Sequence, residues 1–204
     1  MVVKFKKIDV MKMIKQAALV AGIFAAGLVS AQSADMNNML KVGVNGGVST
    51  GGNTSANVGF DLSYQNIVTP GFGLGIATGY NHFFGKTKTF SPGGDVKYND
   101  FGVIPVAALL RYYPARTGFY GGADLGYGFI VGKDNVAKDG SPYNAEMPNG
   151  GFYLKPEIGY HNQNWNFFVH YTKVFTGSKG QIGDVKFNAG TIGAGVAYNI
   201  PLGK

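Results

Sequence analysis

The chain of 204 residues is 45% hydrophobic and only 14% charged, which excludes an intrinsically disordered chain and favours one folded domain. Its formal net charge is +7, but five of its 18 basic residues fall in the first 31 positions, so the charge does not indicate nucleic-acid binding. The sequence has no cysteine, which excludes disulfides, thiolate catalysis, cysteine-ligated zinc and a lipid anchor on an N-terminal cysteine.

Residues 1–31 have the organisation of a cleavable secretory signal peptide. A lysine-rich start precedes thirteen apolar residues, AALVAGIFAAGLV at 17–29, and the small residues VSA at 29–31 then predict cleavage before Gln32. The alternative, a membrane anchor helix, is disfavoured because the apolar stretch is shorter than the roughly 20 residues of a membrane span.

The true start of this segment is open, since Met11 or Met13 can replace Met1 and would shorten the basic region. Cleavage removes five lysines and one aspartate, so 13 basic and 10 acidic residues remain, with a net charge of +3. We expect residues 32–204 to form a single exported domain, and an exported chain without cysteine fits the envelope of a bacterial cell.

Period-2 alternation recurs along the mature chain, and no helical periodicity persists. In the stretch GFYGGADLGYGFIVG at 118–132, the odd positions are apolar or aromatic, whereas the even positions are mostly small and include Asp124. The 33 glycines, more than twice the usual share of about 7%, are typical of sheets with tight turns and close backbone contacts. In chain order the pattern predicts eight strands, at roughly 40–48, 55–66, 71–84, 98–113, 117–132, 150–161, 164–176 and 185–200.

The connections between these strands alternate in length. Short turns follow the second, fourth and sixth strands, and long polar loops at 85–97 and 133–149 follow the third and fifth. Short turns at one end and long loops at the other are typical of an outer-membrane barrel with its turns in the periplasm. We therefore predict an all-β fold, an eight-stranded antiparallel up-and-down transmembrane β-barrel with both termini on the periplasmic side.

Aromatic residues at outward-facing positions predict the two girdles of such a barrel. Phe119 and Phe129 lie ten residues apart on one face, which at about 3.3 Å per residue and a tilt of about 40° spans roughly 25 Å along the barrel axis. The predicted girdle residues are Phe72, Tyr80, Phe119, Phe129 and Trp165.

Asp124 is predicted to point into the barrel, because lipid cannot solvate an unpaired carboxylate and a lumen can pair it. The same parity on the other strands collects three basic and three acidic side chains inside, namely Lys41, Asp61, Arg111, Asp124, Lys155 and Glu157. An eight-stranded barrel is just wide enough to be filled by side chains. We therefore expect a balanced network of ion pairs and a plugged lumen without an open pore.

Two features depart from the regular pattern. Pro105 and Pro156 fall inside predicted strands, and since a closed barrel has no free edge, we expect a bulge near each. Tyr198 is followed by NIPLGK, which displaces the terminal aromatic residue on which many outer-membrane barrels end.

Three stretches carry a likeness to known proteins: the signal peptide ending VSA before Gln32, IPVAALLRYYP at 104–114 and GFYGGADLGYGF at 118–129. With these the chain resembles the small bacterial outer-membrane β-barrel proteins, the OmpA, OmpX and OmpW-like group, over nearly the whole mature chain. The resemblance implies an eight-stranded barrel in the outer membrane of a Gram-negative bacterium. The group includes structural proteins, adhesion and serum-resistance factors, small-solute channels and a few lipid-modifying enzymes, so it supplies no functional residue.

No catalytic residue, cofactor or metal ligand is predicted. His82, Ser91 and Asp95 form the nearest approach to a nucleophile, base and acid, but a girdle histidine beside an ordinary loop serine is the simpler interpretation. His161 and His170 are expected to serve hydrogen bonding, at a turn and in the lumen.

Several functions are consistent with this architecture. The leading hypothesis is a monomeric, non-enzymatic outer-membrane protein that stabilises the envelope or contacts an extracellular ligand through the loops at 85–97 and 133–149. The lysines of these loops would meet lipopolysaccharide phosphates, and no nucleic-acid partner is expected. The alternatives are a narrow channel for small or apolar solutes, with a lateral exit near Pro105, and a barrel enzyme that modifies lipid A. A soluble periplasmic barrel of lipocalin type, with its apolar face inward, is disfavoured by the paired girdles.

Overall fold

The computed structural model describes residues 37–90, 94–162 and 164–202, so the predicted signal peptide lies outside the described residues. The strands are β1 (Asn38–Ser49), β2 (Thr54–Thr69), β3 (Phe72–Gly85), β4 (Thr87–Phe90), β5 (Gly94–Lys97), β6 (Phe101–Tyr112), β7 (Gly118–Gly132), β8 (Gly150–His161), β9 (Trp165–Phe175) and β10 (Ala189–Pro201). None of the described residues forms a helix long and apolar enough to cross a membrane.

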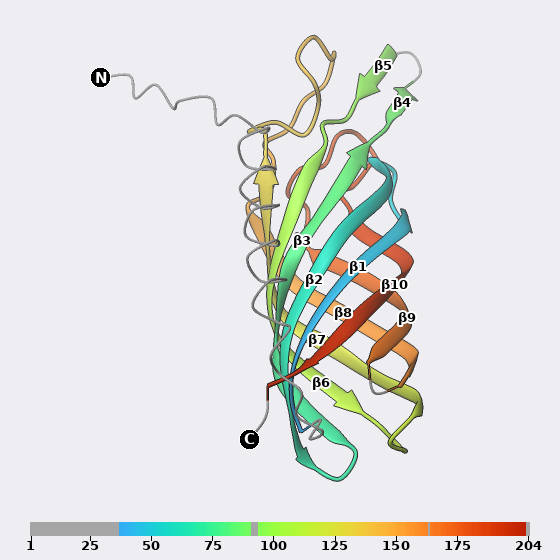
Figure 1. The fold of residues 1–204 in the computed structure, drawn as a ribbon. Helices are drawn as coiled ribbons and strands as arrows, with labels where there is room; N and C mark the ends of the chain where they lie inside the picture. Colours follow the sequence, from blue (N-terminus) through green and yellow to red (C-terminus); the bar gives the residue numbers. More distant parts are fainter. Residues whose placement is uncertain (1–36, 91–93, 163, 203–204) are drawn as a thin grey trace, which may run out of the picture.

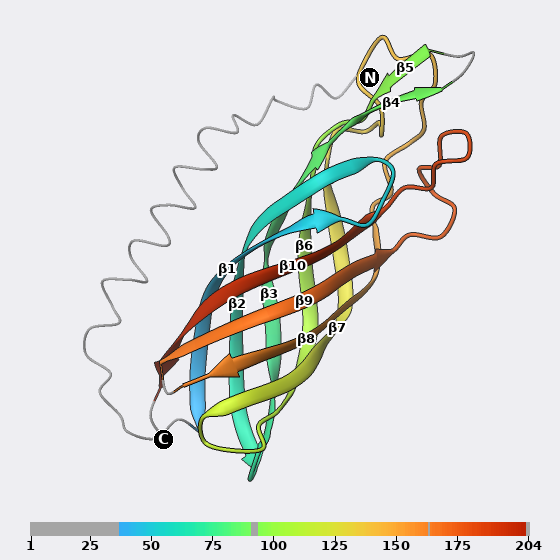
Figure 2. The same cartoon turned by 90° about the vertical axis from the view of Figure 1, so that its right-hand side faces the viewer.

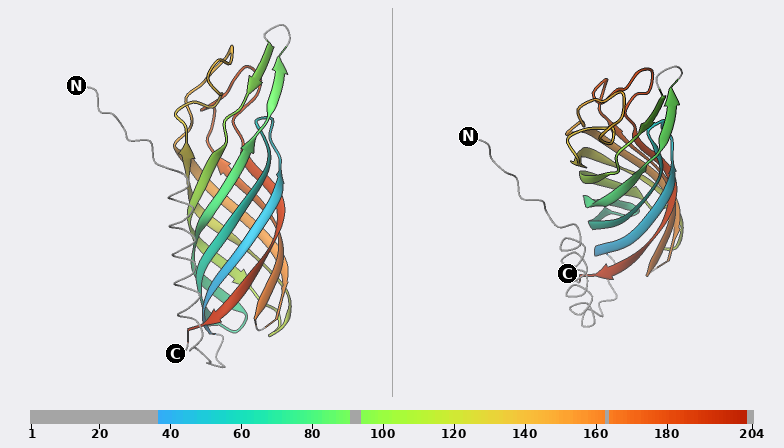
Figure 3. Two further views of the ribbon diagram at one scale, coloured as in Figure 1. Left: turned by 45° about the horizontal axis from the view of Figure 1, so that its top comes forward. Right: turned by 90° about the horizontal axis from the view of Figure 1, so that it is seen from above.

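Eight of these strands close into one antiparallel barrel, in the order β1-β10-β9-β8-β7-β6-β3-β2 (Figure 1 and Figure 3). The predicted eight-stranded antiparallel up-and-down barrel is confirmed. The first and last strands complete the closure, since β1 pairs with β10 from Met39 opposite Pro201 to Ser49 opposite Thr191. Closure leaves the wall without a free strand edge, so its backbone amides and carbonyls can satisfy one another in a medium that offers no water.

The barrel has two unlike ends (Figure 2). At the turn end, where β1 begins and β10 finishes, tight connections join β2 to β3, β6 to β7 and β8 to β9. The loop end carries the longer connections at 86–100, 133–149 and 176–188. The predicted loop 85–97 contains the hairpin of β4 with β5, which the periodicity did not predict because each strand is only four residues long.

Successive residues of each barrel strand face alternately outward and inward. On β3, for example, the outward-facing Leu74 and Ile76 are exposed, whereas the inward-facing Gly73 is buried. The outward positions form an apolar belt that includes Val42, Val44, Val48, Val58, Phe60, Leu74, Ile76, Val106, Leu110, Leu125, Ile158, Phe167, Val169 and Ile192. An apolar outside around a charged inside is the reverse of a soluble lipocalin-type barrel and contradicts that alternative.

The expected bulges at the two prolines are not found in the described ladders, so that prediction was wrong. Pairs are missing at Pro105 between β3 and β6, and at Pro156 between β8 and β9, but the register is the same on both sides of each gap. The other side of each proline stays paired, Pro105 with Gly128 and Pro156 with Ala123. A proline lacks only its own N–H, so the strand loses pairing toward one neighbour and needs no inserted residue.

An apolar cluster closes the loop end, and we call it the apolar cap. It joins inward-facing strand residues to residues of the loops, and its members include Phe83, Phe101, Val103, Ile130, Val96, Tyr98, Val136, Met147, Ile182, Val185 and Phe187. The ring of Phe101 stacks on that of Phe83, with centroids 4.9 Å apart, and contacts Phe187 at 4.8 Å. Burial among these side chains raises the pKa of the Tyr98 hydroxyl above its ordinary value. The cap thus holds the loops over the lumen.

Backbone hydrogen bonds hold the loops of this end together. The amide of Asn99 donates to the Val136 carbonyl at 2.8 Å. The Asn99 side chain donates to the carbonyls of Asn135 and Ala137 at 2.9 and 2.8 Å. The long loop at 133–149 is therefore tied to the segment that leads from β5 into β6.

Candidate functional site

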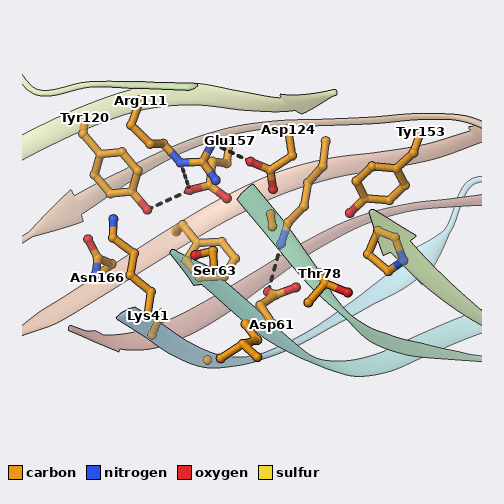
Figure 4. Close-up of a pocket in the computed structure, with 17 residues that line it drawn as sticks. Lys41, Asp61, Ser63, Thr78, Arg111, Tyr120, Asp124, Tyr153, Glu157 and Asn166 are labelled. Carbon is orange, nitrogen blue, oxygen red and sulfur yellow. Dashed lines mark hydrogen bonds and ion pairs between the residues drawn. The ribbon is translucent and has the colours of Figure 1, made fainter. Parts of the chain in front are cut away.

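Arg111 holds two carboxylates in the middle of the lumen (Figure 4). Its Nη1 lies 2.7 Å from Oδ1 of Asp124, and its Nε lies 2.8 Å from Oε1 of Glu157, so one guanidinium of β6 bridges β7 and β8. The Tyr120 hydroxyl donates to the same Glu157 oxygen at 3.0 Å. All three charged side chains are at most 7% exposed. Such buried charges must be paired and hydrogen-bonded, and here each one is.

Lys155 and Asp61 form a second ion pair across the lumen. Lys155 Nζ lies 2.9 Å from Oδ2 of Asp61, and Nδ2 of Asn45 donates to the same oxygen at 3.0 Å. The Asp61 side chain is 19% exposed against 5% for Lys155, so this carboxylate is partly hydrated. Because β8 and β2 are not neighbours in the wall, the pair braces the barrel through its interior.

Lys41 departs from the expected pairing, since no described carboxylate forms an ion pair with it. Its ammonium donates to the Tyr113 hydroxyl at 2.6 Å, and that hydroxyl donates to Oε1 of Gln65 at 3.0 Å. The same ammonium lies 5.2 and 5.9 Å from the ring centroids of Tyr113 and Tyr120, within cation–π range. The structure therefore brings five of the six predicted charges into ion pairs and holds the sixth by tyrosines near the turn end.

Little space is left among these groups. A cavity of about 40 Å³ is lined by Asp61, Arg111, Lys155 and their neighbours, which is room for about one to three water molecules. Glycine allows the side chains to fill the remainder: a Cβ at Gly122 would lie 2.5 Å from Cδ of Arg111, so a larger residue there would displace the guanidinium.

Neutral polar side chains continue the filling toward the loop end. Asn57 Nδ2 donates to Oδ1 of Asn45 at 3.3 Å and to Oδ1 of Asn81 at 3.1 Å. His170 Nδ1 lies 3.0 Å from Thr172 Oγ1, with both residues buried. His170 thus takes part in hydrogen bonding inside the barrel, as its parity predicts.

The predicted girdle residues lie on the outer wall at two levels. Those near the turn end each contact an aromatic residue of another strand, in the pairs Phe72–Tyr112, Phe119–Tyr160 and Trp165–Tyr198, with centroids 4.8, 5.8 and 4.9 Å apart. Toward the loop end, Phe129 contacts Tyr127 at 4.9 Å, and the Tyr80 hydroxyl lies 3.2 Å from Nδ1 of His82. Two such levels, one on each side of the apolar belt, are the arrangement that the girdle prediction expects.

The described residues do not bring together His82 and Asp95, the base and acid of the combination considered from the sequence. His82 Nε2 lies 3.9 Å from Oδ2 of Asp100, whereas Asp95 accepts a hydrogen bond within the β4–β5 hairpin. Ser91 lies outside the described residues. His161 lies at the turn end, 3.3 Å from a backbone carbonyl of the β6–β7 connection, as expected of a hydrogen-bonding histidine.

The lysines of the two predicted ligand-binding loops are all exposed at the loop end, and they are Lys86, Lys88, Lys97, Lys133 and Lys138. Lys86 Nζ donates to the carbonyl of Gly51 at 3.2 Å, and the Lys88 ammonium lies 5.6 Å from the centroid of the Phe90 ring.

Sequence parity identified the inward-facing charges but not their neutral partners. Tyr120 and Asn45 share the inward parity, which is the signal that points to them. Tyr113 lies one residue beyond β6, in the turn, where parity no longer predicts direction. The apolar cap has a signal too, because Phe83 and Phe101 occupy inward positions where a water-filled lumen would have polar residues.

No protein-family model and no curated protein sequence matches this chain. Among solved structures it is similar to the outer membrane protein OprG from Pseudomonas aeruginosa, with a TM-score of 0.50 and 14% identity over 79% of this chain and 94% of that chain. The chain has the fold of a bacterial outer-membrane β-barrel.

Two further solved structures are similar at lower scores. They are Ail, the attachment invasion locus protein of Yersinia pestis, and Neisserial surface protein A, both with a TM-score of 0.45. Identities are 13% and 18%, and the alignments cover 79% and 78% of this chain and 97% and 96% of those chains.

Proposed function

We propose that this protein is a monomeric, non-enzymatic, non-conducting barrel of the outer membrane that acts as a structural or surface-interaction protein through its loop end. The observation that carries the proposal is that side chains fill the lumen at three successive levels. The apolar cap, the Arg111 network and the Lys41–Tyr113 group lie in series, and the cavity among the charges has a volume of only about 40 Å³. A hydrated solute needs a wider path than this.

The outer wall supports the location. An apolar belt between two aromatic levels fits a lipid bilayer, and long loops at one end fit the extracellular side. The apolar cap and the hydrogen bonds of Asn99 hold the 133–149 loop in place, which supports a preorganised surface there. A preorganised surface binds a partner with a smaller loss of conformational entropy than a mobile loop does. The exposed lysines there favour an anionic partner such as lipopolysaccharide phosphate.

Outer-membrane fractionation, followed by gel electrophoresis with and without boiling, tests the location and the closed barrel. We expect the protein in the outer-membrane fraction, with a mobility that shifts on boiling. A periplasmic protein, or one without the shift, would overturn the proposal. Shortening the 133–149 loop tests the surface role, since we expect reduced binding to lipopolysaccharide and an unchanged mobility shift.

A second candidate is a channel with a lateral exit for small apolar solutes, and one observation favours it. The ladder between β3 and β6 lacks the pairs of Gly79 with Pro105 and Tyr80 with Ile104, and Pro105 also lines the central cavity. Fewer hydrogen bonds resist an opening of the wall there. Uptake of an apolar fluorescent solute by vesicles that contain the barrel distinguishes the candidates, since a channel raises uptake above that of empty vesicles and a plugged barrel does not.

A further inference from the structure

A groove of about 630 Å³ lies at the loop end beside the ends of β1, β9 and β10, and we call it the rim groove. Its lining comes from the β1–β2 connection, the end of β9, the β9–β10 loop and one residue of β4, namely Thr50, Gly51, Gly52, Lys88, Lys173, Val174, Phe175, Thr176, Gly177, Asp184, Val185, Lys186, Phe187 and Asn188. The groove is separate from the charged lumen, and neither predicted ligand-binding loop contributes more than Lys88 to it.

The charge of the rim groove favours an anion. Lys88, Lys173 and Lys186 line it against the single carboxylate of Asp184. Thr50 and Thr176 add hydroxyl groups to the lining. Lysine ammonium and threonine hydroxyl groups are donors that suit a phosphate.

Lys173 is fixed in place at the groove. It occupies an outward-facing position of β9, its stem passes Gly190, and its Nζ donates to Oδ1 of Asn188 at 2.7 Å. The Asn188 backbone amide donates in turn to Oδ1 of the buried Asn53 at 3.1 Å. The Thr50 amide donates to the carbonyl of Gly190 at 2.9 Å, which joins the β1–β2 connection to the start of β10. The floor of the groove is therefore preorganised.

Immediately below, on the membrane side, the wall presents a row of apolar side chains. Val48 of β1 is opposite Ile192 of β10, and Ile192 is opposite Tyr171 of β9. Val48 and Ile192 are 66% and 58% exposed, so this row is open to acyl chains. Figure 2 shows the three strands side by side as they approach the loop end. A soluble anion would contact only the groove, whereas a phosphorylated lipid would contact the groove with its headgroup and the apolar row with its acyl chains.

We propose that the rim groove binds the phosphorylated headgroup of a glycolipid in the surrounding leaflet, with its acyl chains on the row of Val48, Ile192 and Tyr171. The proposal rests on the outward orientation of the loop end given above. It names a partner site formed mainly by the β1–β2 and β9–β10 connections at the rim of the barrel, and it ties lipid binding to Lys173 and Lys186.

The test measures retention of diphosphorylated lipid A by the full mature barrel in detergent, by native mass spectrometry. The variant K173Q/K186Q is compared with the control K179Q/R116Q, which removes the same charge from the β9–β10 loop and from the turn end, outside the groove. We expect the groove variant to bind about tenfold more weakly, the control to bind as the parent does, and dephosphorylated lipid A to bind about tenfold more weakly to the parent. Inorganic phosphate at the same concentration should not compete.

Equal binding by the groove variant and the parent would overturn the proposal. An equal loss in both variants would also overturn it, because it would indicate general charge attraction. Competition by inorganic phosphate would replace the lipid with a free anion as the ligand. The mobility shift on boiling, measured for every variant, keeps this result separate from the barrel assignment: unchanged lipid binding by the groove variant with an intact shift overturns the rim-groove proposal and leaves the proposed function standing.

Discussion

The middle of the lumen and the apolar cap fill the same barrel by opposite chemistry. In the middle, Arg111 bridges Asp124 and Glu157 at 2.7 and 2.8 Å, and in the cap Phe101 contacts two other rings. The middle lies at the level of the apolar belt, where inward-facing charges must find their partners inside the lumen. The cap lies at the loop end, next to water, so burying apolar side chains against one another there stabilises the fold. Directional bonds therefore fix the strands, and hydrophobic burial fixes the loops.

The largest expected effect comes from removing the shared cation of the middle. Arg111→Met leaves Asp124 and Glu157 as two buried carboxylates without an ion-pair partner. Breaking a buried pair from one side costs about 3–5 kcal/mol, and we expect the free energy of unfolding to fall by that amount. Urea unfolding in lipid or detergent, followed by Trp165 fluorescence, measures the change.

A triple variant sharpens the same point. In R111M/D124N/E157Q the charges leave together, so we expect most of the lost stability to return. If the triple variant is as unstable as R111M, the stability came from packing of the arginine stem and the electrostatic account of the middle is wrong.

The next effect tests the cap. Phe187→Ala removes a buried ring, and we expect a loss of about 3 kcal/mol. Because the cap gathers the loops, the loss should be local: amide exchange should quicken at Val136 and Ile182 and stay slow in β7. Phe129→Ala, on the outward face, serves as the control. Equal acceleration throughout the barrel strands would show that cap and wall unfold as one unit.

A smaller effect is expected at the second ion pair. Lys155→Met leaves Asp61 with the hydrogen bond from Asn45 and with partial hydration, since its side chain is 19% exposed. We expect a loss of about 1–3 kcal/mol in the urea experiment, less than for Arg111→Met. A loss as large as that of Arg111→Met would mean that hydration does not relieve Asp61.

The smallest effect concerns the connection between loops. Asn99→Ala removes two side-chain hydrogen bonds to the 133–149 loop, each worth about 0.5–1.5 kcal/mol. We expect faster proteolysis of this loop with an unchanged urea midpoint for the barrel. Unchanged proteolysis would show that the apolar cap alone orders the loop.

Much of the barrel could be predicted from the sequence because period-2 alternation reports directly on which side of a wall a residue faces. Asp124 illustrates this, since parity alone points it inward. Parity does not report which groups a side chain contacts inside the barrel, so it does not predict the hydrogen bond from Lys41 to the Tyr113 hydroxyl. Parity also does not tell which neighbouring strand faces the missing N–H of Pro105. The predicted bulge was wrong because only the pairing toward one neighbour is lost there. For the cap, the inward position of Phe101 is visible in the sequence, but its contact with Phe187, a residue far away along the chain, is reported by no local pattern.

Single-channel recording in a planar bilayer tests the central claim most directly, because the claim is that two unlike plugs close one lumen. The purified mature barrel, shown by its mobility shift to be folded, is added to a bilayer in concentrated salt. The account predicts no stepwise conductance. Regular conductance steps from the folded protein would contradict it and would establish an open path past both the Arg111 network and the apolar cap.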